Sequence, residues 1–282
     1  MKRYVLLRLR MQSVFSASLE GNAAMAGLDE IFSRSIMLYG TGAFERLRRG
    51  FVAVVGLGGV GSHAAEALVR AGFGRLRVID CDIVKASDVN RQIIALSTNI
   101  GTAKVSAAKD RLLAINPHLE IDCRHTFFHD DTASSLITSD LDFVIDAIDS
   151  LHPKGELIRY CVDRGIPIIS SLGAAGRTDP LQVKVSKLDE TTICPLARAL
   201  RRHLRSHGIP TDISVVYSTE RPLKIHDDFA GQVLAAPDTY ARGRLRQALP
   251  SLPTVPAIFG LIAANHVILN VIGGQSPDKC LV

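Results

Sequence analysis

The sequence predicts an α/β protein with a Rossmann-like, mostly parallel sheet flanked by helices, and two observations predict it. Short apolar segments alternate with segments of helical spacing from Phe51 to Ser171, as in successive βαβ units. The first apolar segment leads directly into the glycine-rich sequence Gly56-Leu-Gly-Gly-Val-Gly61. A strand, a glycine turn and a helix in this order are typical of nucleotide-binding sheets.

The individual elements follow in the order that such a sheet requires. We expect strands at 51–55, 75–80, 120–125, 142–146 and 166–171, and helices at 61–71, 103–115 and 153–164. The pattern changes after Gly173, where 181–185 and 213–218 alternate as half-exposed strands do. Residues 257–272 read as a packed helix. The C-terminal half is therefore expected to be elaborated, with extra strands and a basic segment.

The length and composition indicate one folded domain. The chain has 282 residues, of which 47% are hydrophobic, enough for one sizeable core. Residues 29–282 are expected to form this domain, with a nucleotide-binding half at 51–172 and a substrate half at 173–282. Residues 1–28 resemble a transit peptide, but a later translation start at Met11 or Met25 is the simpler interpretation. We expect this extension to be disordered or not translated.

Membrane and disulfide-rich classes fit the sequence poorly. No run of 18 apolar residues occurs, so no membrane span is expected. The five cysteines are odd in number and contain no C-x-x-C pair, which argues against zinc on paired cysteines and suits the reducing cytoplasm. The net charge of +5 permits a polyanionic partner without requiring one.

The residues beyond the glycine turn favour nucleotidyl transfer over redox chemistry. Asp80 lies at the end of the second strand, where an acid binds the ribose of NAD and of ATP equally well. Arg91 and Lys104 could neutralise a departing pyrophosphate, which hydride transfer does not require. Asp149 follows a later strand and offers the oxygen ligands that magnesium prefers.

The joint spacing of five short motifs resembles the ubiquitin-activating-enzyme-like superfamily, which includes ThiF, MoeB and HesA. The motifs are Gly56-x-Gly-Gly-x-Gly61, Asp80-x-Asp82, Arg91-Gln92, Lys104 and Asp146-x-x-Asp149. Members adenylate a carboxylate with ATP and magnesium and are typically homodimers. The resemblance covers about residues 31–186 and implies both properties for this chain.

Further motifs resemble one branch of that superfamily, the tRNA threonylcarbamoyladenosine dehydratases. They are Asn90-Arg-Gln, Asp146-Ala-Ile-Asp-Ser150, Pro153-Lys, Pro195-Leu-Ala197, Tyr217-Ser-Thr-Glu220 and Phe259-Gly260. In that branch ATP activates the threonyl carboxylate of a modified tRNA adenosine, and ring closure gives the cyclic nucleoside with loss of water overall. The resemblance therefore implies a tRNA substrate.

The resemblance also assigns roles to individual residues. It implies that the phosphates lie on the turn formed by Gly56, Gly58, Gly59 and Gly61. It implies that Asp80 binds the ribose, that Asp82 steadies the site and that Asp149 holds magnesium. It implies that Arg91 and Lys104 bind the phosphate tail and that Gln92 lies beside them. The catalytic candidates are Asp149, Arg91, Lys104 and Arg34, where Arg34 would reach the ATP of the partner subunit.

Three positions depart from the superfamily pattern. Asp88 stands where Asn is frequent, and an anionic side chain there would repel phosphate unless it turned away or bound a metal. Arg34 lies at an imperfect offset, and Met37 stands where a related chain has Arg. Cys194 precedes Pro195, where an acid is common in the branch.

A basic segment follows Pro195 and contains no acid from Thr191 to Thr211. Taken alone, such a charge run is usually a solvated helix face. With a tRNA substrate in view, we expect phosphate contacts at helical spacing from Arg198, Arg201, Arg202 and Arg205.

Three other functions remain open at this stage. An activator of a ubiquitin-like sulfur-carrier protein would use Cys194 as its nucleophile, whereas the dehydratase chemistry needs no enzyme thiol. A non-catalytic nucleotide-binding scaffold could support a sulfur-transfer partner. An NAD dehydrogenase explains the glycine turn but leaves Arg91, Lys104 and Asp149 without a role.

Overall fold

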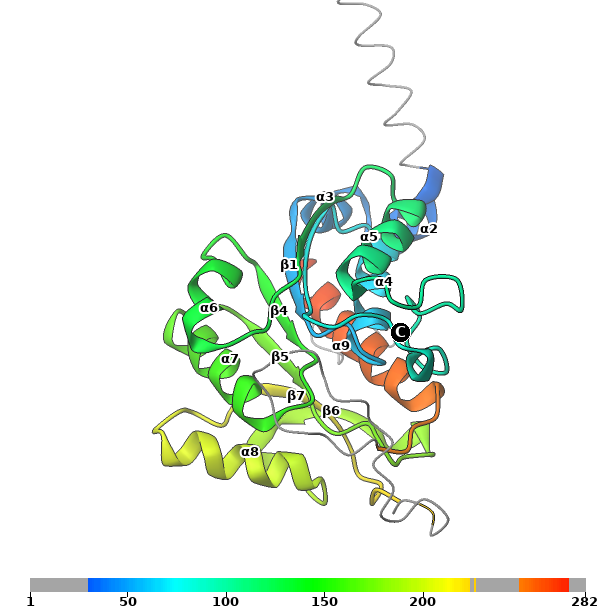
Figure 1. Cartoon of the computed structure of the whole chain (residues 1–282). Helices are drawn as coiled ribbons and strands as arrows, with labels where there is room; N and C mark the ends of the chain where they lie inside the picture. Colours follow the sequence, from blue (N-terminus) through cyan, green and yellow to red (C-terminus); the bar gives the residue numbers. More distant parts are fainter. Residues whose placement is uncertain (1–29, 224–225, 227–248, 274–282) are drawn as a thin grey trace, which may run out of the picture.

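A mostly parallel sheet forms the centre of the molecule (Figure 1). The computed structural model describes residues 30–223, 226 and 249–273. In this part of the chain the sheet has seven strands in the order β3-β2-β1-β4-β5-β7-β6, and β6 runs antiparallel to β7. The strands are β1 Phe51–Val55, β2 Arg75–Ile79, β3 Glu120–Arg124, β4 Phe143–Asp146, β5 Ile168–Ser171, β6 Val183–Lys187 and β7 Ser214–Ser218. The predicted fold class is confirmed.

Helices cover both faces of this sheet, so the structure has three layers (Figure 1). One face carries α4 Gly61–Ala71, α5 Lys104–Ile115 and α9 Thr254–Val271, with α2 Ser33–Tyr39 and α3 Thr41–Arg49 nearby. The other face carries α6 Asp130–Leu136, α7 Leu151–Asp163 and α8 Pro195–Ser206. Successive side chains of β1 point to opposite faces of the sheet and so enter two different cores. Val52 and Val54 face α4 and α9, whereas Ala53 and Val55 face α7.

Most element boundaries agree with the sequence-based expectation. The extra strands expected after Gly173 are β6 and β7, although β6 begins at Val183 because Pro180–Gln182 form a 3-10 turn. The sequence did not predict α2, α3 or α6. Helix α6 has seven residues, mostly polar, and buries only Ala133 and Leu136, so it lacks a readable apolar repeat.

Helix α9 is a packed helix, as its sequence predicted. Its 18 residues have a mean hydropathy of 1.6, which by length and composition alone would suffice to cross a membrane. Val255, Phe259, Ala263 and Val267 are nevertheless buried in the core that α4 shares. A Cβ at Gly260 would lie 2.3 Å from the Val60 carbonyl oxygen, so this glycine permits the close approach of the two segments.

The N-terminal extension at 1–28, for which disorder or a later translation start was expected, lies outside the described residues, as do residues 224–225 and 227–248.

Candidate functional site

The candidate residues meet where three neighbouring strands end. Val55 at the end of β1 pairs with Ile79 at the end of β2 and with Asp146 at the end of β4. The segments that follow these strands therefore begin side by side. Strands β2 and β3 lie on one side of β1, and the next strand along the chain, β4, lies on its other side. Open α/β sheets bind ligands at such a switch point, outside the carboxyl ends of the strands.

The glycine turn is shaped by contacts within the protein at two positions and is open at a third. Gly56 has φ of +91°, and a Cβ there would lie 2.8 Å from the Ala147 carbonyl oxygen. A Cβ at Gly61 would lie 1.7 Å from the Gly56 carbonyl oxygen. Gly58 has no described atom within 4 Å of its Cβ position. The fold therefore requires Gly56 and Gly61, whereas Gly58 leaves room for a group that approaches the backbone.

Gly59 fits between two segments of the site. A Cβ there would lie 3.1 Å from Pro256 Cβ and 3.3 Å from Arg91 Cγ. The absence of a side chain thus lets α9 and the Arg91 segment pack against the turn.

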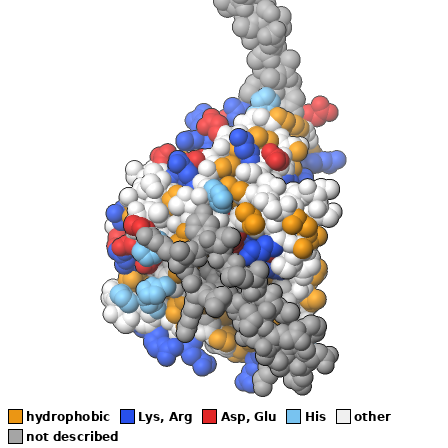
Figure 2. Space-filling view, in the orientation of Figure 1, with side chains coloured by type: hydrophobic (Ala, Val, Ile, Leu, Met, Phe, Trp, Pro, Cys, Tyr) orange, Lys and Arg blue, Asp and Glu red, His pale blue; other side chains and the backbone are white. Residues whose placement is uncertain are grey.

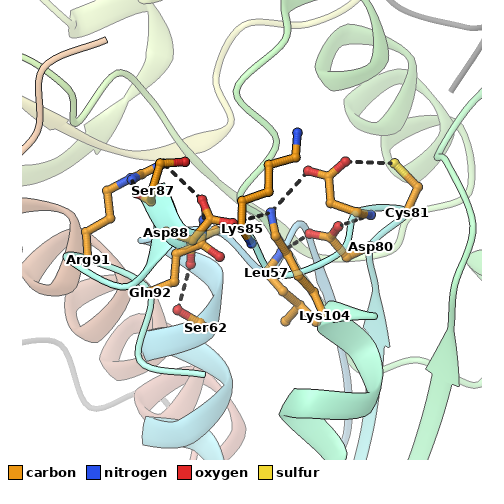
Figure 3. Close-up of polar contacts among 12 residues, drawn as sticks. Leu57, Ser62, Asp80, Cys81, Lys85, Ser87, Asp88, Arg91, Gln92 and Lys104 are labelled. Carbon is orange, nitrogen blue, oxygen red and sulfur yellow. Dashed lines mark hydrogen bonds and ion pairs between the residues drawn. The ribbon is translucent and has the colours of Figure 1, made fainter. Parts of the chain in front are cut away.

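Asp80 connects the glycine turn to the segment after β2. Its Oδ2 accepts the backbone N–H of Leu57 at 2.6 Å, and its Oδ1 accepts that of Asp82 at 2.7 Å (Figure 3). Burial raises the pKa of Asp80 and the charge of Asp82 adds to this, while Lys104 opposes it. Each carboxylate oxygen keeps a further lone pair, so Asp80 remains able to accept hydrogen bonds from a ligand.

Lys104 brings a positive charge to the same edge. It begins α5, it is 5% exposed, and its Nζ lies 3.1 Å from Asp82 Oδ2. Burial alone would lower the pKa of Lys104, but Asp80, Asp82 and Asp88 outweigh it and hold this pKa above its ordinary value. Lys104 is therefore a cation at neutral pH, held by carboxylates.

Asp88 does not point an unbalanced charge into the site. It is 5% exposed, and its Oδ1 accepts a hydrogen bond from Gln92 Nε2 at 2.7 Å (Figure 3). Arg91 Nη2 lies 3.4 Å from the same oxygen, and Lys104 Nζ lies 3.9 Å from Oδ2. The repulsion expected from the sequence is therefore offset by the two cations that the sequence assigned to phosphate.

The loop that carries Asp149 is fixed by a buried ionic network. Lys154 Nζ donates to Asp146 Oδ2 at 2.7 Å, to Ser170 Oγ at 3.1 Å and to the Ser171 carbonyl at 2.9 Å. Asp146 Oδ1 accepts the backbone N–H of Ile148 at 3.0 Å. This network anchors the backbone immediately before Asp149, whose own side chain is exposed.

Two further predicted positions are Arg34 and Asp149. Arg34 is exposed on α2, and within the described residues no hydrogen bond or ion pair joins it to Arg91, Lys104 or Asp149. Among described residues, potential metal-ligand atoms gather within 4.8 Å of one another at Asp80, Cys81 and Asp82, a group that does not include Asp149.

A thiolate ligand is disfavoured in that group. Burial and the charges of Asp82 and Asp80 raise the pKa of Cys81 to about 12. The protonated thiol is a poor metal ligand, so the oxygens of this edge are the better donors.

Helix α8 presents a basic outer face. Its apolar residues Ala197, Leu200 and Leu204 are buried in the second core. Figure 2 shows Lys and Arg side chains along the edge of the molecule where α8 lies, with histidines beside them. The exposed arginines are Arg198, Arg202 and Arg205.

Arg201 differs from the other three arginines because it is half-buried. Its Nη1 donates to the Leu188 carbonyl at 3.1 Å and to the Thr191 carbonyl at 3.0 Å. These bonds close the turn before α8, so Arg201 has a structural role that helical spacing alone did not reveal.

Cys194 is the residue before α8 and is buried, at 2% exposure. A nucleophile that receives a protein C-terminus must be reachable, so this burial argues against Cys194 as the nucleophile of a sulfur-carrier activator.

Sequence reasoning assigned no role in the site to two residues that shape it. Ser62 Oγ donates to the Gly58 carbonyl at 2.6 Å and accepts the backbone N–H of Ile93 at 3.3 Å, which joins the glycine turn to the Arg91 segment. The sequence presents Lys154 only as part of a motif. Lys154 lies little more than one helical turn after Asp149 and close in sequence to Asp146. This position was the available signal that Lys154 pairs with an acid at the end of the strand.

Comparison with known proteins agrees with this geometry. The ThiF family model matches residues 32–280. The tRNA threonylcarbamoyladenosine dehydratase of Bacillus subtilis is 38% identical over 242 residues, which cover 86% of this chain and 94% of that protein.

Solved structures of the Escherichia coli tRNA N6-threonylcarbamoyladenosine dehydratase are similar in fold. The complex with AMP has a TM-score of 0.78 at 33% identity and covers 86% of this chain and 94% of the other. The complex with ATP has a TM-score of 0.76, with the same identity and coverage. The resemblance inferred from the motifs is confirmed, and the chain belongs to the ThiF family.

Proposed function

We propose that this chain is an ATP-dependent dehydratase that adenylates the threonyl carboxylate of threonylcarbamoyladenosine in tRNA and promotes its cyclisation. The observation that carries the proposal is the convergence of the glycine turn, Asp80, Arg91 and Lys104 at the switch point of the sheet, in a family member similar to such dehydratases over 86% of its length. That arrangement suits a nucleotide with a negatively charged phosphate tail.

The nucleotide would lie along the carboxyl ends of β1 and β2. The turn from Gly56 to Gly61, including Gly58 and Gly59, would hold the phosphates. Asp80 would accept the ribose hydroxyls, and Asp82 would keep Lys104 in place. Arg91 and Lys104 would bind the phosphate tail, with Gln92 beside them. Support comes from the open space at Gly58 and from the cluster of charges around Lys104.

Asp149 would hold the magnesium ion. Its exposed carboxylate follows β4 at the ligand-binding edge, and the anchored backbone of Ile148 precedes it. Carboxylate oxygens are the donors that magnesium prefers, so the residues present fit the ion. When bound, magnesium would neutralise phosphate charge during transfer.

The reaction balances without an enzyme thiol. A threonyl carboxylate oxygen attacks the α-phosphorus of ATP, and pyrophosphate leaves. A nitrogen of the same modified nucleoside then attacks the acyl carbon, AMP leaves, and the nitrogen loses its proton. Arg91 and Lys104 would stabilise the charge on the departing pyrophosphate.

The tRNA would contact the basic face of α8. The exposed side chains Arg198, Arg202 and Arg205 lie on one outer face without neighbouring acids in the helix, which suits a row of phosphates. Arg201 is the least suitable of the four predicted contacts, because it is bonded to the turn at 188–191.

A homodimer would complete the site. Helix α2 exposes Met37 at 76% and Leu38 at 74%, with Ile31 just before it at 53%, which suits burial against another chain. Arg34 on the same helix would then reach the nucleotide of the partner. A cytoplasmic location and a sulfur-transfer partner protein belong to the same proposal, although the dehydration itself requires no such partner.

The second candidate is an activator of a ubiquitin-like sulfur-carrier protein. It shares the adenylation chemistry but needs an accessible cysteine if a thioester is formed. The burial of Cys194 therefore favours the dehydratase.

One assay tests both candidates. Purified protein with ATP, magnesium and threonylcarbamoyladenosine-bearing tRNA is expected to form AMP, pyrophosphate and the cyclic nucleoside, whereas Asp149→Ala is expected to form none. Cys194→Ala is the matched control and should keep the activity. Product formation by Asp149→Ala would refute the site assignment, and AMP formation that requires a small carrier protein instead of tRNA would favour the second candidate.

A further inference from the structure

Asp88 is a buried acid in the middle of the phosphate-binding residues. It ends the 3-10 turn Ala86–Asp88, and its two oxygens have different partners. Oδ2 accepts the backbone N–H of Lys85 at 3.0 Å, and Oδ1 accepts Gln92 Nε2 at 2.7 Å. These bonds hold the carboxylate in one orientation, so Asp88 is a fixed negative charge (Figure 3).

Both cations proposed to bind the phosphate tail lie beside this charge. Arg91 Nη2 is 3.4 Å from Asp88 Oδ1, and Lys104 Nζ is 3.9 Å from Oδ2. Lys104 and Asp88 each have a side chain that is 7% exposed, so little water screens their interaction. The site thus already contains a counter-ion for the groups that would receive the nucleotide.

The orientation of Gln92 also depends on Asp88. A carboxylate only accepts hydrogen bonds, so the Gln92 amide turns its nitrogen toward Asp88. Gln92 is 4% exposed, and its Oε1 has no hydrogen-bond partner within the described structure. Asp88 therefore orients the neighbouring amide, and it adds to the contacts that hold the cations, where Arg91 Nη1 also donates to the Ser87 carbonyl at 2.6 Å and Lys104 Nζ lies 3.1 Å from Asp82.

We propose that Asp88 is a positioning residue that helps Ser87 and Asp82 to hold Arg91 and Lys104 and that competes with the nucleotide's phosphates for these cations, so that it sets how strongly the site prefers a triphosphate over fewer phosphates. The inference rests on the proposed ATP site. The negative charge of Asp88 weakens the attraction of Arg91 and Lys104 for a phosphate. This penalty on binding is expected to grow with the number of phosphates that contact the two cations. The nucleoside without phosphate is unaffected.

The test compares wild type with Asp88→Asn, a variant of nearly the same shape. The Asn oxygen can still accept the Lys85 N–H while the charge is removed. ATP, ADP, AMP and adenosine are each titrated at fixed magnesium by calorimetry. Asp110→Asn is the matched control, because it removes one exposed negative charge from α5 outside the site.

The expected result is a gain in affinity that grows with phosphate number. Asp88→Asn should tighten ATP on the order of 10-fold, tighten AMP less and leave adenosine unchanged. Asp110→Asn should change none of the four. The proposal would be overturned if the ratio of ATP affinity to adenosine affinity in Asp88→Asn were equal to or lower than the ratio in wild type.

Destabilisation of the variant does not obscure this result. Partial unfolding lowers the apparent affinity for all four ligands by the same factor, so the ratio of ATP affinity to adenosine affinity does not change. Asp88→Ser provides a second variant that lacks the charge, and the same increase in the ratio is expected. If the ratio changes as expected but no cyclic nucleoside forms with tRNA, the proposed function fails and the role of Asp88 stands.

Discussion

Lys154 and Asp146 form an ion pair that solvent does not reach. Nζ lies 2.7 Å from Oδ2, and both side chains are 0% exposed. The remaining polar atoms are also satisfied, because Ser170 Oγ donates to the same Asp146 oxygen at 2.6 Å and Asp146 Oδ1 accepts the Ile148 N–H. This buried pair and its hydrogen bonds connect β4, β5 and α7. The connection lies next to the loop that carries Asp149.

Removal of one member of this pair should cost more than removal of both. Lys154→Met leaves an unpaired buried carboxylate and is expected to lower the free energy of unfolding by about 3–5 kcal/mol. The double variant Lys154→Met/Asp146→Asn removes both charges and should recover much of this loss. Urea denaturation measures the difference. Equal destabilisation of the single and double variants would contradict a cost that arises from the unpaired charge.

The glycine turn should respond differently at two of its positions. Gly61→Ala places a Cβ 1.7 Å from the Gly56 carbonyl oxygen, so the backbone must shift and stability should fall by about 3 kcal/mol or more. Gly58→Ala meets no described atom within 4 Å and should change stability by less than about 0.5 kcal/mol. ATP affinity should nevertheless fall at least about 10-fold in Gly58→Ala, because the methyl group occupies the approach to the backbone. Thermal unfolding and an ATP titration of each variant provide the check, and unchanged ATP binding by Gly58→Ala would argue against phosphate contact there.

Local sequence patterns predicted the parts of the fold that depend on chain neighbours. Helix α4 and strand β1 are readable because apolar spacing and glycines act over a few residues. Asp80 and Asp149 were identifiable because each follows a strand, and parallel strands bring such positions to one edge.

Contacts between distant segments could not be read in this way. Arg201 has the helical spacing of its basic neighbours, yet the turn at 188–191 binds it. Asp88 was expected to conflict with phosphate, because the sequence does not reveal that Lys104, a residue of another element, lies 3.9 Å away. The antiparallel direction of β6 likewise depends on its pairing with β7.

The exposed arginines of α8 should contribute to tRNA binding through charge. Arg198→Gln, Arg202→Gln and Arg205→Gln should each weaken tRNA binding and reduce the slope of log affinity against log salt by about 0.7–0.9 for each phosphate that is no longer neutralised. Filter binding or fluorescence anisotropy at several salt concentrations measures the slope. Lys109→Gln on α5 is the control, since this exposed lysine lies on the opposite face of the sheet. A slope unaffected by all three arginine variants would exclude α8 from the tRNA surface.

Glu66 should make part of the stability dependent on pH. It is a residue of α4 that accepts hydrogen bonds from Arg70 Nε at 2.7 Å and from Arg111 Nε of α5 at 2.5 Å. Burial alone would raise the pKa of Glu66, but Arg111 and Arg70 outweigh it and hold the pKa below its ordinary value of 4.5. A carboxyl group whose pKa is depressed in the folded state stabilises the fold above the unfolded pKa, and this contribution is lost as the pH falls through the folded value.

Glu66→Gln should therefore lose about 1 kcal/mol of stability at neutral pH, a modest figure because both arginines are partly exposed. The difference from wild type should shrink once the pH falls below 4.5. Urea denaturation across this pH range measures it. Glu45→Gln is the matched control, because Glu45 pairs with Arg48 at 3.5 Å on the exposed surface of α3 and should give a small difference at every pH. A Glu66→Gln difference that stays constant as the pH falls would show that packing, and not the charge of the carboxylate, accounts for the contribution of Glu66.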